Sequence, residues 1–282
     1  MIGRLRFTLP LLAALLSACT FQVSERNFIR ATPDPTDAPA PAANFAGLPG
    51  RIEVHAIPAA ADADLHAVWL KQPGSRFTVL FFGGNMSRIS SGGRRVAEHL
   101  LPFGVDLFIV DHRSSGRSEG QPELELLLGD ALTAFDFLTT QLAVPADRVI
   151  VQGHSLGSFM AGQVARHRRV AGLVLSGSAT TTEDWVNALI PWYYKPIVRT
   201  EIDPKLHGRG NLSVVEAQSA PLLIIAGGRD KQTPAWLSRK LADAAAAKQR
   251  RATLVVAKHG EHESLFDQPE VLDAYRRFLA TL

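Results

Sequence analysis

Residues 149–157 read VIVQGHSLG, and this stretch decides the fold. Its first four residues are an apolar strand candidate, and a helical pattern follows the turn. Gly153, Ser155 and Gly157 fit the pattern G-x-S-x-G, in which a serine stands on a sharp turn between a strand and a helix. The glycines leave room for crowded backbone. We therefore predict that Ser155 Oγ points out of the sheet and that the Leu156 N–H group faces the oxyanion of an acyl transfer. The alternative is a glycine-rich turn with an idle serine.

Strands and helices alternate on both sides of this turn. Continuous apolar strands suit a parallel sheet that is covered on both faces. Their alternation with helices predicts βαβ units and a doubly wound α/β sheet. The strand candidates are residues 51–57, 65–71, 77–82, 105–110, 148–152, 170–175, 222–226 and 253–257, and the helical patterns are 93–101, 123–141, 156–166, 234–248 and 269–282.

Composition excludes several classes of protein. The chain has 282 residues, of which 46% are hydrophobic and 20% charged, as in a globular protein. The formal charge is +3. Arg4 and Arg6 lie in a segment that we expect to be removed, and without them the chain has 28 basic and 27 acidic residues, or a charge of +1. With no basic run and no zinc-finger spacing, we expect no nucleic-acid partner. The single cysteine, Cys19, excludes an internal disulfide and a Cys-based zinc site.

The first 19 residues have the pattern of an exported protein. Residues 1–6 are short and basic, and residues 7–18 are apolar, which predicts a signal peptide over residues 1–18. The apolar run is too short for a membrane-spanning helix. Residues 16–19, LSAC, resemble the lipobox of bacterial lipoproteins. That resemblance implies cleavage before Cys19 and acylation of this cysteine. The alternative is a plain secretory signal that contains a cysteine.

The expected product is anchored to a membrane of the bacterial cell envelope. Two or more acyl chains hold a protein stably on a bilayer. Thr20 follows the cysteine, in place of the Asp of an inner-membrane retention signal, which favours the outer membrane facing the periplasm. Residues 32–43 read TPDPTDAPAPAA and show no apolar periodicity. They predict an extended tether over residues 19–46, followed by a folded domain over residues 47–282.

From about residue 47 to the end, the chain resembles the α/β-hydrolase superfamily. The resemblance is closest to the branch of monoacylglycerol-lipase-like and serine-aminopeptidase-like hydrolases. Residues 111–120, DHRSSGRSEG, are similar to the D-x-R-G-x-G-x-S-x-G segment of that branch, with Ser114 in place of a glycine. The resemblance implies an α/β-hydrolase fold: a mostly parallel eight-stranded sheet, helices on both faces and a short cap insertion over about residues 178–220.

A serine nucleophile needs a base and an acid that orients the base. In this fold their order along the chain is Ser, acid, His. Residues 227–230, GGRD, follow a strand candidate and resemble the G-x-x-D loop of the family, which implies Asp230 as the acid. Residues 258–262, KHGEH, align with the G-x-G-H ending of the family, which implies His262 as the base.

Other assignments stay open at these positions. His259 competes with His262, and Glu183 or Asp184 competes with Asp230, which is also a plausible turn former or helix cap. His259 and His262, with glutamates nearby, suggest a metal site, but the pattern H-E-x-x-H is absent. We therefore expect no metal and no cofactor.

The oxyanion hole needs a second donor from the loop after the third strand. Residues 83–85, GGN, resemble the H-G-N segment of the family, with Gly83 in place of the histidine. The resemblance implies that the Asn85 N–H group pairs with that of Leu156. Met86 is the second choice.

The cap insertion is rich in large apolar residues. An apolar lid over a serine nucleophile suggests an acyl or other hydrophobic substrate group. The alternative is that these side chains pack the cap onto the sheet. They are Trp185, Leu189, Ile190, Trp192, Tyr193, Tyr194 and Ile197.

Together these patterns predict a membrane-tethered serine hydrolase. Its expected substrate is a small molecule with a carboxylic ester or a related acyl bond, cleaved through an acyl-enzyme. Two alternatives remain: a serine peptidase or amidase of the same fold, and a non-catalytic envelope lipoprotein that retains the fold.

Overall fold

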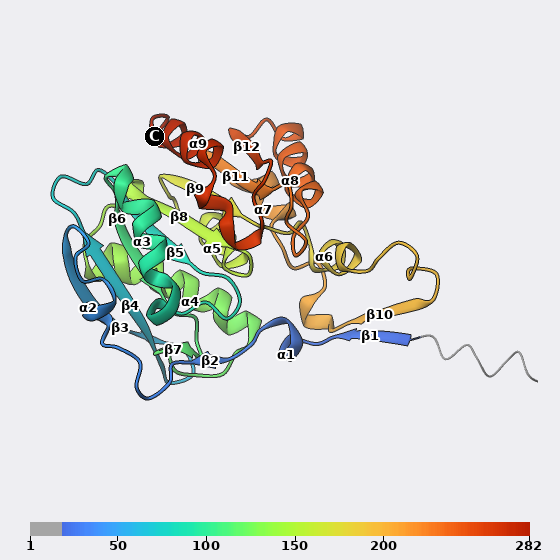
Figure 1. The fold of residues 1–282 in the computed structure, drawn as a ribbon, viewed down its shortest axis with the longest axis horizontal. Helices are drawn as coiled ribbons and strands as arrows, with labels where there is room; N and C mark the ends of the chain where they lie inside the picture. The colour runs from blue at the N-terminus through green and yellow to red at the C-terminus, as the bar shows by residue number, and fades with distance from the viewer. Residues whose placement is uncertain (1–18) are drawn as a thin grey trace, which may run out of the picture.

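A computed structural model of the protein describes residues 19–282. The predicted signal peptide, residues 1–18, lies outside the described residues. The main body is one eight-stranded sheet with the order β12-β11-β9-β8-β5-β6-β4-β3 (Figure 1). β3 and β4 pair antiparallel, as do β4 and β6, and all other neighbours are parallel. The strands are β3 (Arg51–Ala59), β4 (Ala63–Lys71), β5 (Thr78–Phe82), β6 (Asp106–Val110), β8 (Val149–His154), β9 (Gly172–Ser176), β11 (Leu222–Gly227) and β12 (Ala252–Ala257).

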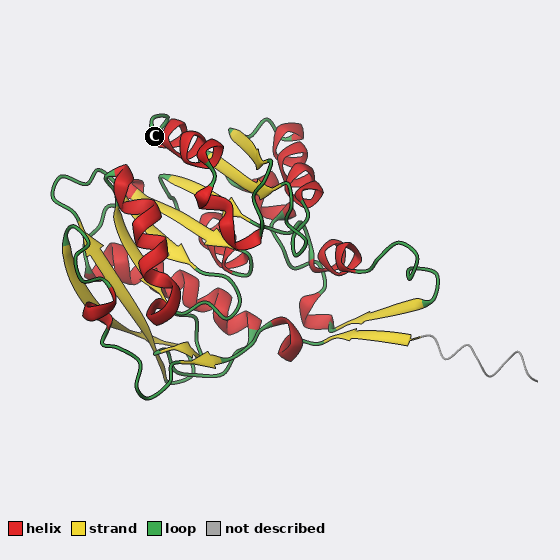
Figure 2. Ribbon diagram, in the orientation of Figure 1, coloured by secondary structure: helices red, strands yellow, loops and turns green. Residues whose placement is uncertain are grey.

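Helices cover both faces of this sheet (Figure 2). α3 (Arg94–Leu100) and α9 (Pro269–Leu279) pack on one face, and α4 (Leu124–Asp136), α5 (Gly157–His167) and α8 (Ala235–Ala247) pack on the other. Every residue of β5 and β11 is buried, as continuous apolar strands between two helical layers should be. The predicted α/β-hydrolase fold with a mainly parallel sheet is confirmed.

The cap insertion between β9 and β11 is small, and part of it extends away from the domain. It contains α6 (Thr182–Leu189), β10 (Val198–Ile202) and α7 (Leu212–Ala217). β10 pairs in parallel with β1 (Cys19–Val23), and Figure 1 shows this two-stranded ribbon projecting away from the main sheet. We call β1, β10 and the loop before β10 the arm. Among the described residues, no helix has the length and apolar character needed to cross a bilayer.

Residues 19–46 differ from the predicted extended tether, because they fold back along the domain. After β1 come α1 (Glu25–Phe28), β2 (Thr32–Pro33), which pairs with β7 (Ser115–Gly116), and α2 (Pro41–Asn44). The physical reason is apolar burial. Phe28, Ile29 and Phe45 are all buried, and full burial of such a side chain contributes roughly 1.5–3 kcal/mol. The Pro/Ala run alone gave no sign of these contacts.

The segment that resembles a family motif, residues 111–120, is structural here. Arg113 and Asp130 of α4 are both buried and form a two-pronged ion pair, with Arg113 Nε 2.7 Å from Asp130 Oδ2. His112 Nε2 lies 2.7 Å from the Gly83 carbonyl oxygen, which ties this loop to the end of β5. Asp111 accepts a hydrogen bond from the Ile89 N–H group at 2.7 Å. The motif therefore holds the loop after β6 against the segment that follows β5, at the carboxyl edge of the sheet.

Replacing Asp130 with Asn should lower the free energy of unfolding by about 3–5 kcal/mol, because it leaves the Arg113 charge buried without a carboxylate. Urea denaturation measures this change. Asp273→Asn is the matched control: it breaks an exposed ion pair with Arg276 and should cost no more than about 1 kcal/mol. Equal losses in the two variants would refute the assigned role of the buried pair.

Candidate active site

The turn after β8 has the geometry that the sequence predicts. Ser155 has φ of +53°, in the left-handed region that side-chain-bearing residues rarely adopt. A Cβ atom on Gly153 would lie 2.1 Å from the Gly157 carbonyl oxygen, and one on Gly157 would lie 2.2 Å from that of Phe82. Only glycine fits at either position. The Ser155 N–H group donates to the Ser176 carbonyl at 2.9 Å, which fixes the turn between two parallel strands.

The loop after β5 lies beside the serine. A Cβ atom on Gly84 would lie 3.4 Å from Ser155 Cβ, and Asn85, Met86 and Leu156 line the same cavity as Ser155. Within residues 19–282, the backbone N–H groups of Asn85, Met86 and Leu156 donate no hydrogen bond. They are therefore free to donate to a substrate oxygen, and Leu156 adds the positive end of the α5 dipole.

Asp230 and His262 come together from two loops at the carboxyl edge of the sheet. His262 Nδ1 lies 2.8 Å from Asp230 Oδ2, and both side chains are almost fully buried. Asp230 follows β11, and His262 begins the 3-10 helix η6 (His262–Asp267) that follows β12. Because an ionised carboxylate only accepts hydrogen bonds, this contact places a proton on Nδ1 and leaves Nε2 as the basic nitrogen.

Further donors hold the Asp230 carboxylate. Thr233 donates to it twice, from its backbone N–H group and from its hydroxyl, each at 2.8 Å, and the Gln232 N–H group donates at 2.8 Å. Burial acts to raise the pKa of Asp230. The hydrogen bond and the charge of His262, together with the hydrogen bonds of Thr233, outweigh burial and lower the pKa. The carboxylate is thus kept ionised beside the imidazole. The sequence offered no signal for Thr233.

The competing assignments lie elsewhere. His259 is exposed, and within residues 19–282 the histidine hydrogen-bonded to Asp230 is His262. Glu183 Oε1 lies 2.9 Å from His207 Nδ1, and Asp184 Oδ2 accepts from Lys240 Nζ at 2.7 Å. Neither carboxylate faces His262, so the structure brings together only the pair that the family resemblance implies.

Ser155 and His262 lie in neighbouring cavities but are not hydrogen-bonded to each other among the described residues. Ser155 opens into a cavity of about 240 Å³, and His262 lines a second one of about 390 Å³. Asn85 and Met86 line both cavities, so the two meet at the loop after β5. Catalytic hydrogen bonds are often long or absent without substrate and tighten when it binds.

The serine cavity is mainly apolar, and part of its wall was not expected. Trp185 of the cap and Phe28 of the N-terminal segment meet there with ring centroids 5.4 Å apart. The Asn85 side chain donates to the Phe28 carbonyl at 2.9 Å and accepts from the Arg30 N–H group at 3.0 Å. Residues predicted to be a tether thus form a wall of the cavity. The one sequence signal was the apolar pair Phe28-Ile29. The apolar lining residues are Phe28, Met86, Leu156, Phe159, Ala179 and Trp185.

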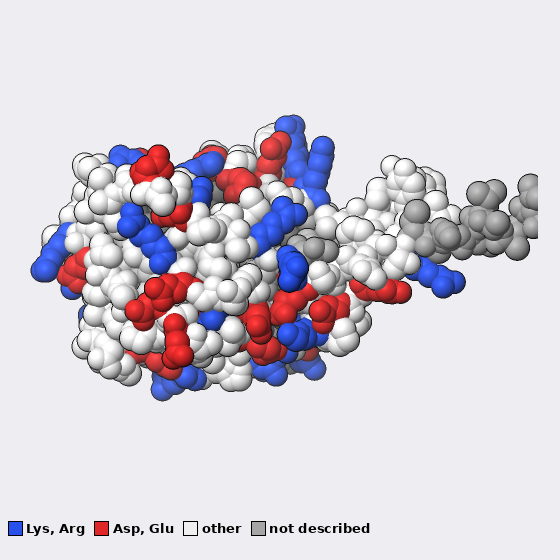
Figure 3. All heavy atoms as spheres, turned by 90° about the horizontal axis from the view of Figure 1, so that it is seen from below, with Lys and Arg blue, Asp and Glu red and all other residues white. Residues whose placement is uncertain are grey.

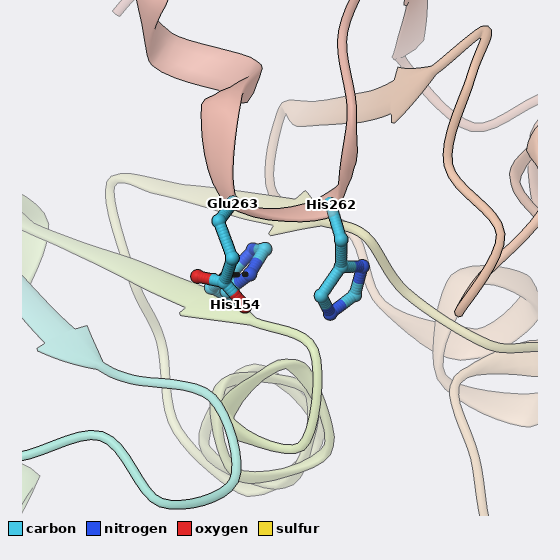
Figure 4. A group of neighbouring side chains, drawn as sticks. All are labelled: His154, His262 and Glu263. Atoms are coloured by element: carbon cyan, nitrogen blue, oxygen red, sulfur yellow. Dashed lines mark ion pairs between the residues drawn. The ribbon is translucent and has the colours of Figure 1, made fainter.

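A second histidine stands beside His262. The His154 and His262 ring centroids are 4.7 Å apart, and His154 Nε2 lies 3.9 Å from Glu263 Oε2. Figure 4 shows the Glu263 side chain against the His154 ring, with the His262 ring next to them. The His154 imidazole lowers the pKa of the Glu263 carboxyl despite opposition from burial. The sequence analysis gave neither His154 nor Glu263 a role.

These three side chains also form a group of potential metal ligands in the described part of the chain. One ligand atom from each of His154, His262 and Glu263 lies within 4.8 Å of the others. Ligands of one tetrahedral zinc ion lie closer together, at roughly 3.4 Å for zinc–nitrogen bonds of about 2.1 Å. The three side chains would have to move closer together to bind one ion, and His262 is already hydrogen-bonded to Asp230 through Nδ1. The expectation of no metal therefore stays a prediction.

The fold and the serine turn define the class of protein as an α/β-hydrolase. The family model of prolyl oligopeptidases, Peptidase_S9, matches residues 126–281, more than half of the chain. The chain therefore belongs to the prolyl oligopeptidase family of the α/β-hydrolase superfamily. It is a hydrolase of the serine-hydrolase type. The narrower resemblance to monoacylglycerol-lipase-like enzymes stays a prediction.

Individual proteins are similar to this chain in sequence or in fold. An uncharacterized protein of Mycobacterium tuberculosis strain H37Rv, Rv2307c, is 34% identical over 206 residues, covering 73% of this chain and 70% of the relative. The esterase Pf2001 of Pyrococcus furiosus has the same fold, with a TM-score of 0.69, 19% identity, and coverage of 89% and 98% of the two chains. An acylaminoacyl peptidase of Pyrococcus horikoshii aligns with a TM-score of 0.62 and 15% identity, over 84% of this chain and 42% of its own.

Asp230→Asn should lower the free energy of unfolding by about 1.5–3 kcal/mol at pH 7, the usual net contribution of a hydrogen bond to a charged group. The lowered pKa of native Asp230 stabilises the fold fully above the unfolded value of about 3.9, and this contribution disappears as the pH falls through the native pKa. The gap between wild type and variant should therefore narrow below about pH 4. Urea titrations between pH 3 and 7 test this, and a gap that is constant or widens in acid would contradict the assignment.

Proposed function

We propose that this protein is a membrane-tethered serine hydrolase that cleaves a carboxylic ester. The observation that carries the proposal is the buried Asp230–His262 pair, whose cavity adjoins the apolar cavity of a serine on a strained strand-to-helix turn. An apolar cavity favours an acyl chain. The position of the aromatic residue Trp185 in its wall agrees with an acyl-binding lid.

The reaction would proceed through an acyl-enzyme. His262 Nε2 takes the proton of the Ser155 hydroxyl while Oγ attacks the ester carbonyl. Asp230 holds the imidazole in the required tautomer, and the N–H groups of Leu156 and Asn85 stabilise the oxyanion. The ester C–O bond breaks, and the alcohol leaves with the proton from His262. Water, deprotonated by His262, then releases the carboxylic acid and frees Ser155.

A peptide or amide substrate is the second candidate. It is favoured by the family match, since the family is that of prolyl oligopeptidases, and by the acylaminoacyl peptidase among the solved structures of this fold. The ester is preferred because the serine cavity is lined mainly by apolar side chains, with Arg30 the one charged residue in its wall. The same machinery cleaves both bonds, so direct assay decides.

The anchor is the other part of the proposal. The apolar run of residues 7–18 ends in Leu16-Ser17-Ala18, directly before Cys19, and this pattern supports acylation of Cys19 in the bacterial envelope. With several acyl chains the enzyme would stay on its membrane, which we place at the outer membrane facing the periplasm.

Turnover of p-nitrophenyl esters from acetate to palmitate tests the activity. Ser155→Ala should lower kcat by at least about 10⁴-fold, because removal of one triad member disables the whole unit. Ser213→Ala is the matched control, since Ser213 lies on α7 and bonds to Arg166 outside both cavities. Peptide p-nitroanilides run alongside. If only the anilides are turned over, the substrate is a peptide or amide and not an ester. Turnover that persists in Ser155→Ala would overturn the serine mechanism.

Labelling with radioactive palmitate tests the anchor. Wild-type protein expressed in a bacterial host should incorporate label and sediment with membranes, whereas Cys19→Ser should incorporate none. Thr20→Ser is the control, and it should behave as wild type because only the cysteine carries the acyl chains. Wild-type protein that is cut after Ala18, unlabelled and recovered in the soluble fraction would show a plain secretory signal instead.

A further inference from the structure

The loop before β10 carries the three most exposed large apolar side chains of the described residues, and a fourth exposed one beside them. Trp192 is 80% exposed, Ile197 58%, Tyr193 57% and Tyr194 47%. We call these four residues the arm tip. They neither pack the cap onto the sheet nor line either cavity next to Ser155, so both expectations from the sequence fail for them.

The arm tip is an ordered surface. Backbone hydrogen bonds from Tyr194 to Pro191 and from Ile197 and Val198 to Tyr194 hold successive turns at 2.9–3.0 Å. The rings contact one another, with centroids 5.8 Å apart for Trp192 and Tyr193 and 4.7 Å apart for Tyr193 and Tyr194. Contiguous exposed apolar surface of this kind marks an interaction site.

The proposed anchor emerges at this surface. β1 begins at Cys19, which pairs with Val198, the residue that follows Ile197 of the arm tip. Phe21, two residues further along β1, is 49% exposed. If Cys19 is acylated as proposed, its chains enter the bilayer next to the arm tip, so the same membrane lies within reach of these side chains.

The chemistry of the arm tip suits a bilayer interface. Trp and Tyr concentrate at the boundary between headgroups and acyl chains, and aromatic side chains there are typically accompanied by basic ones. Lys195 lies within the tip loop and Arg199 follows it, both exposed. Figure 3 shows that the face of the arm turned to the viewer is mostly uncharged, whereas charged side chains gather on the body.

The arm also leads directly to the serine cavity. Trp185 of α6 lies seven residues before Trp192, and Phe28 lies five residues after Val23 at the end of β1. Both side chains line the cavity of Ser155 and contact each other. The two chain segments that reach the arm tip therefore each contribute an aromatic side chain to the wall of the cavity.

We infer that the arm tip inserts into the interface of a phospholipid bilayer and holds the Ser155 cavity at the membrane, so that the enzyme takes its acyl substrate from membrane lipid. The uptake of substrate from membrane lipid rests on the proposed function. The docking half rests on the exposed aromatic residues and on the position of Cys19.

Fluorescence quenching by brominated lipid tests the docking. Membrane-extracted mature protein, which begins at Cys19, is reconstituted into vesicles of phosphatidylcholine and phosphatidylglycerol whose acyl chains carry bromine, and its tryptophan emission is compared with that in unbrominated vesicles. Trp192→Phe should abolish at least half of the quenching. Trp236→Phe is the matched control, since Trp236 is 41% exposed on α8 and is not part of the arm. Trp236→Phe should leave the quenching from the arm intact.

Two results would overturn the docking. One is equal quenching in wild type and Trp192→Phe. The other is Trp192 emission that changes with protein concentration and not with bromination, which would make a second copy of this chain the occupant. Because Trp192 is 80% exposed, its replacement should leave folding intact, and circular dichroism verifies this.

Turnover of two substrates tests the lipid source. The triple variant Trp192→Ala, Tyr193→Ala, Tyr194→Ala should hydrolyse a soluble short-chain ester within about twofold of wild type. It should hydrolyse an ester embedded in vesicles at least tenfold more slowly. An equal loss on both substrates, or no loss on either, would refute delivery from the membrane. If no ester is turned over by wild type, the proposed function fails, and the quenching experiment still decides the docking.

Discussion

The left-handed backbone of Ser155 is the constraint on which the rest of the site depends. A side-chain-bearing residue in this conformation costs of the order of 1–3 kcal/mol, and it persists only where the surroundings over-determine it. Gly153 and Gly157 provide that setting, since backbone oxygens occupy the space of their missing side chains. The close approach of Gly157 to the Phe82 carbonyl brings β5, β8 and α5 together at one edge. The same approach places the loop of Asn85 beside the nucleophile.

The parts of the molecule that sequence could predict are those whose signals are local. Apolar runs such as the one in β11 identified the central strands, and G-x-S-x-G identified the turn, because strand burial and tight turns constrain neighbouring residues directly. Asp230 and His262 could be selected by chain order and residue type. The family resemblance already favoured His262 over His259. The hydrogen bond between His262 and Asp230 needed the structure, since the two residues are 32 positions apart in the chain.

The missed parts depend on contacts between distant residues. Thr32 lies beside Ser115, 83 positions further along, and the Pro/Ala run that contains it shows no pattern of burial. Glu25 accepts from the Leu124 N–H group at 2.6 Å, where a carboxylate stabilises the N-terminus of α4. Thr233 supports Asp230 through a hydroxyl that any turn could carry. None of these residues has a local signature, because each acts only through its partner.

The N-terminal segment links the proposed membrane anchor to the cavity of Ser155. The segment that would connect the enzyme to its membrane, from β1 to Arg30, also contains Phe28 and Arg30, which line the cavity of Ser155 and bond to the Asn85 side chain. A protease that cuts between Arg30 and Thr32 would therefore separate two things from the domain with one cleavage: the proposed anchor, and the residues Phe28 and Arg30 that line the pocket. If the anchor is as proposed, an enzyme released in this way would lack part of the wall of its pocket, and release would lower its activity at the same moment.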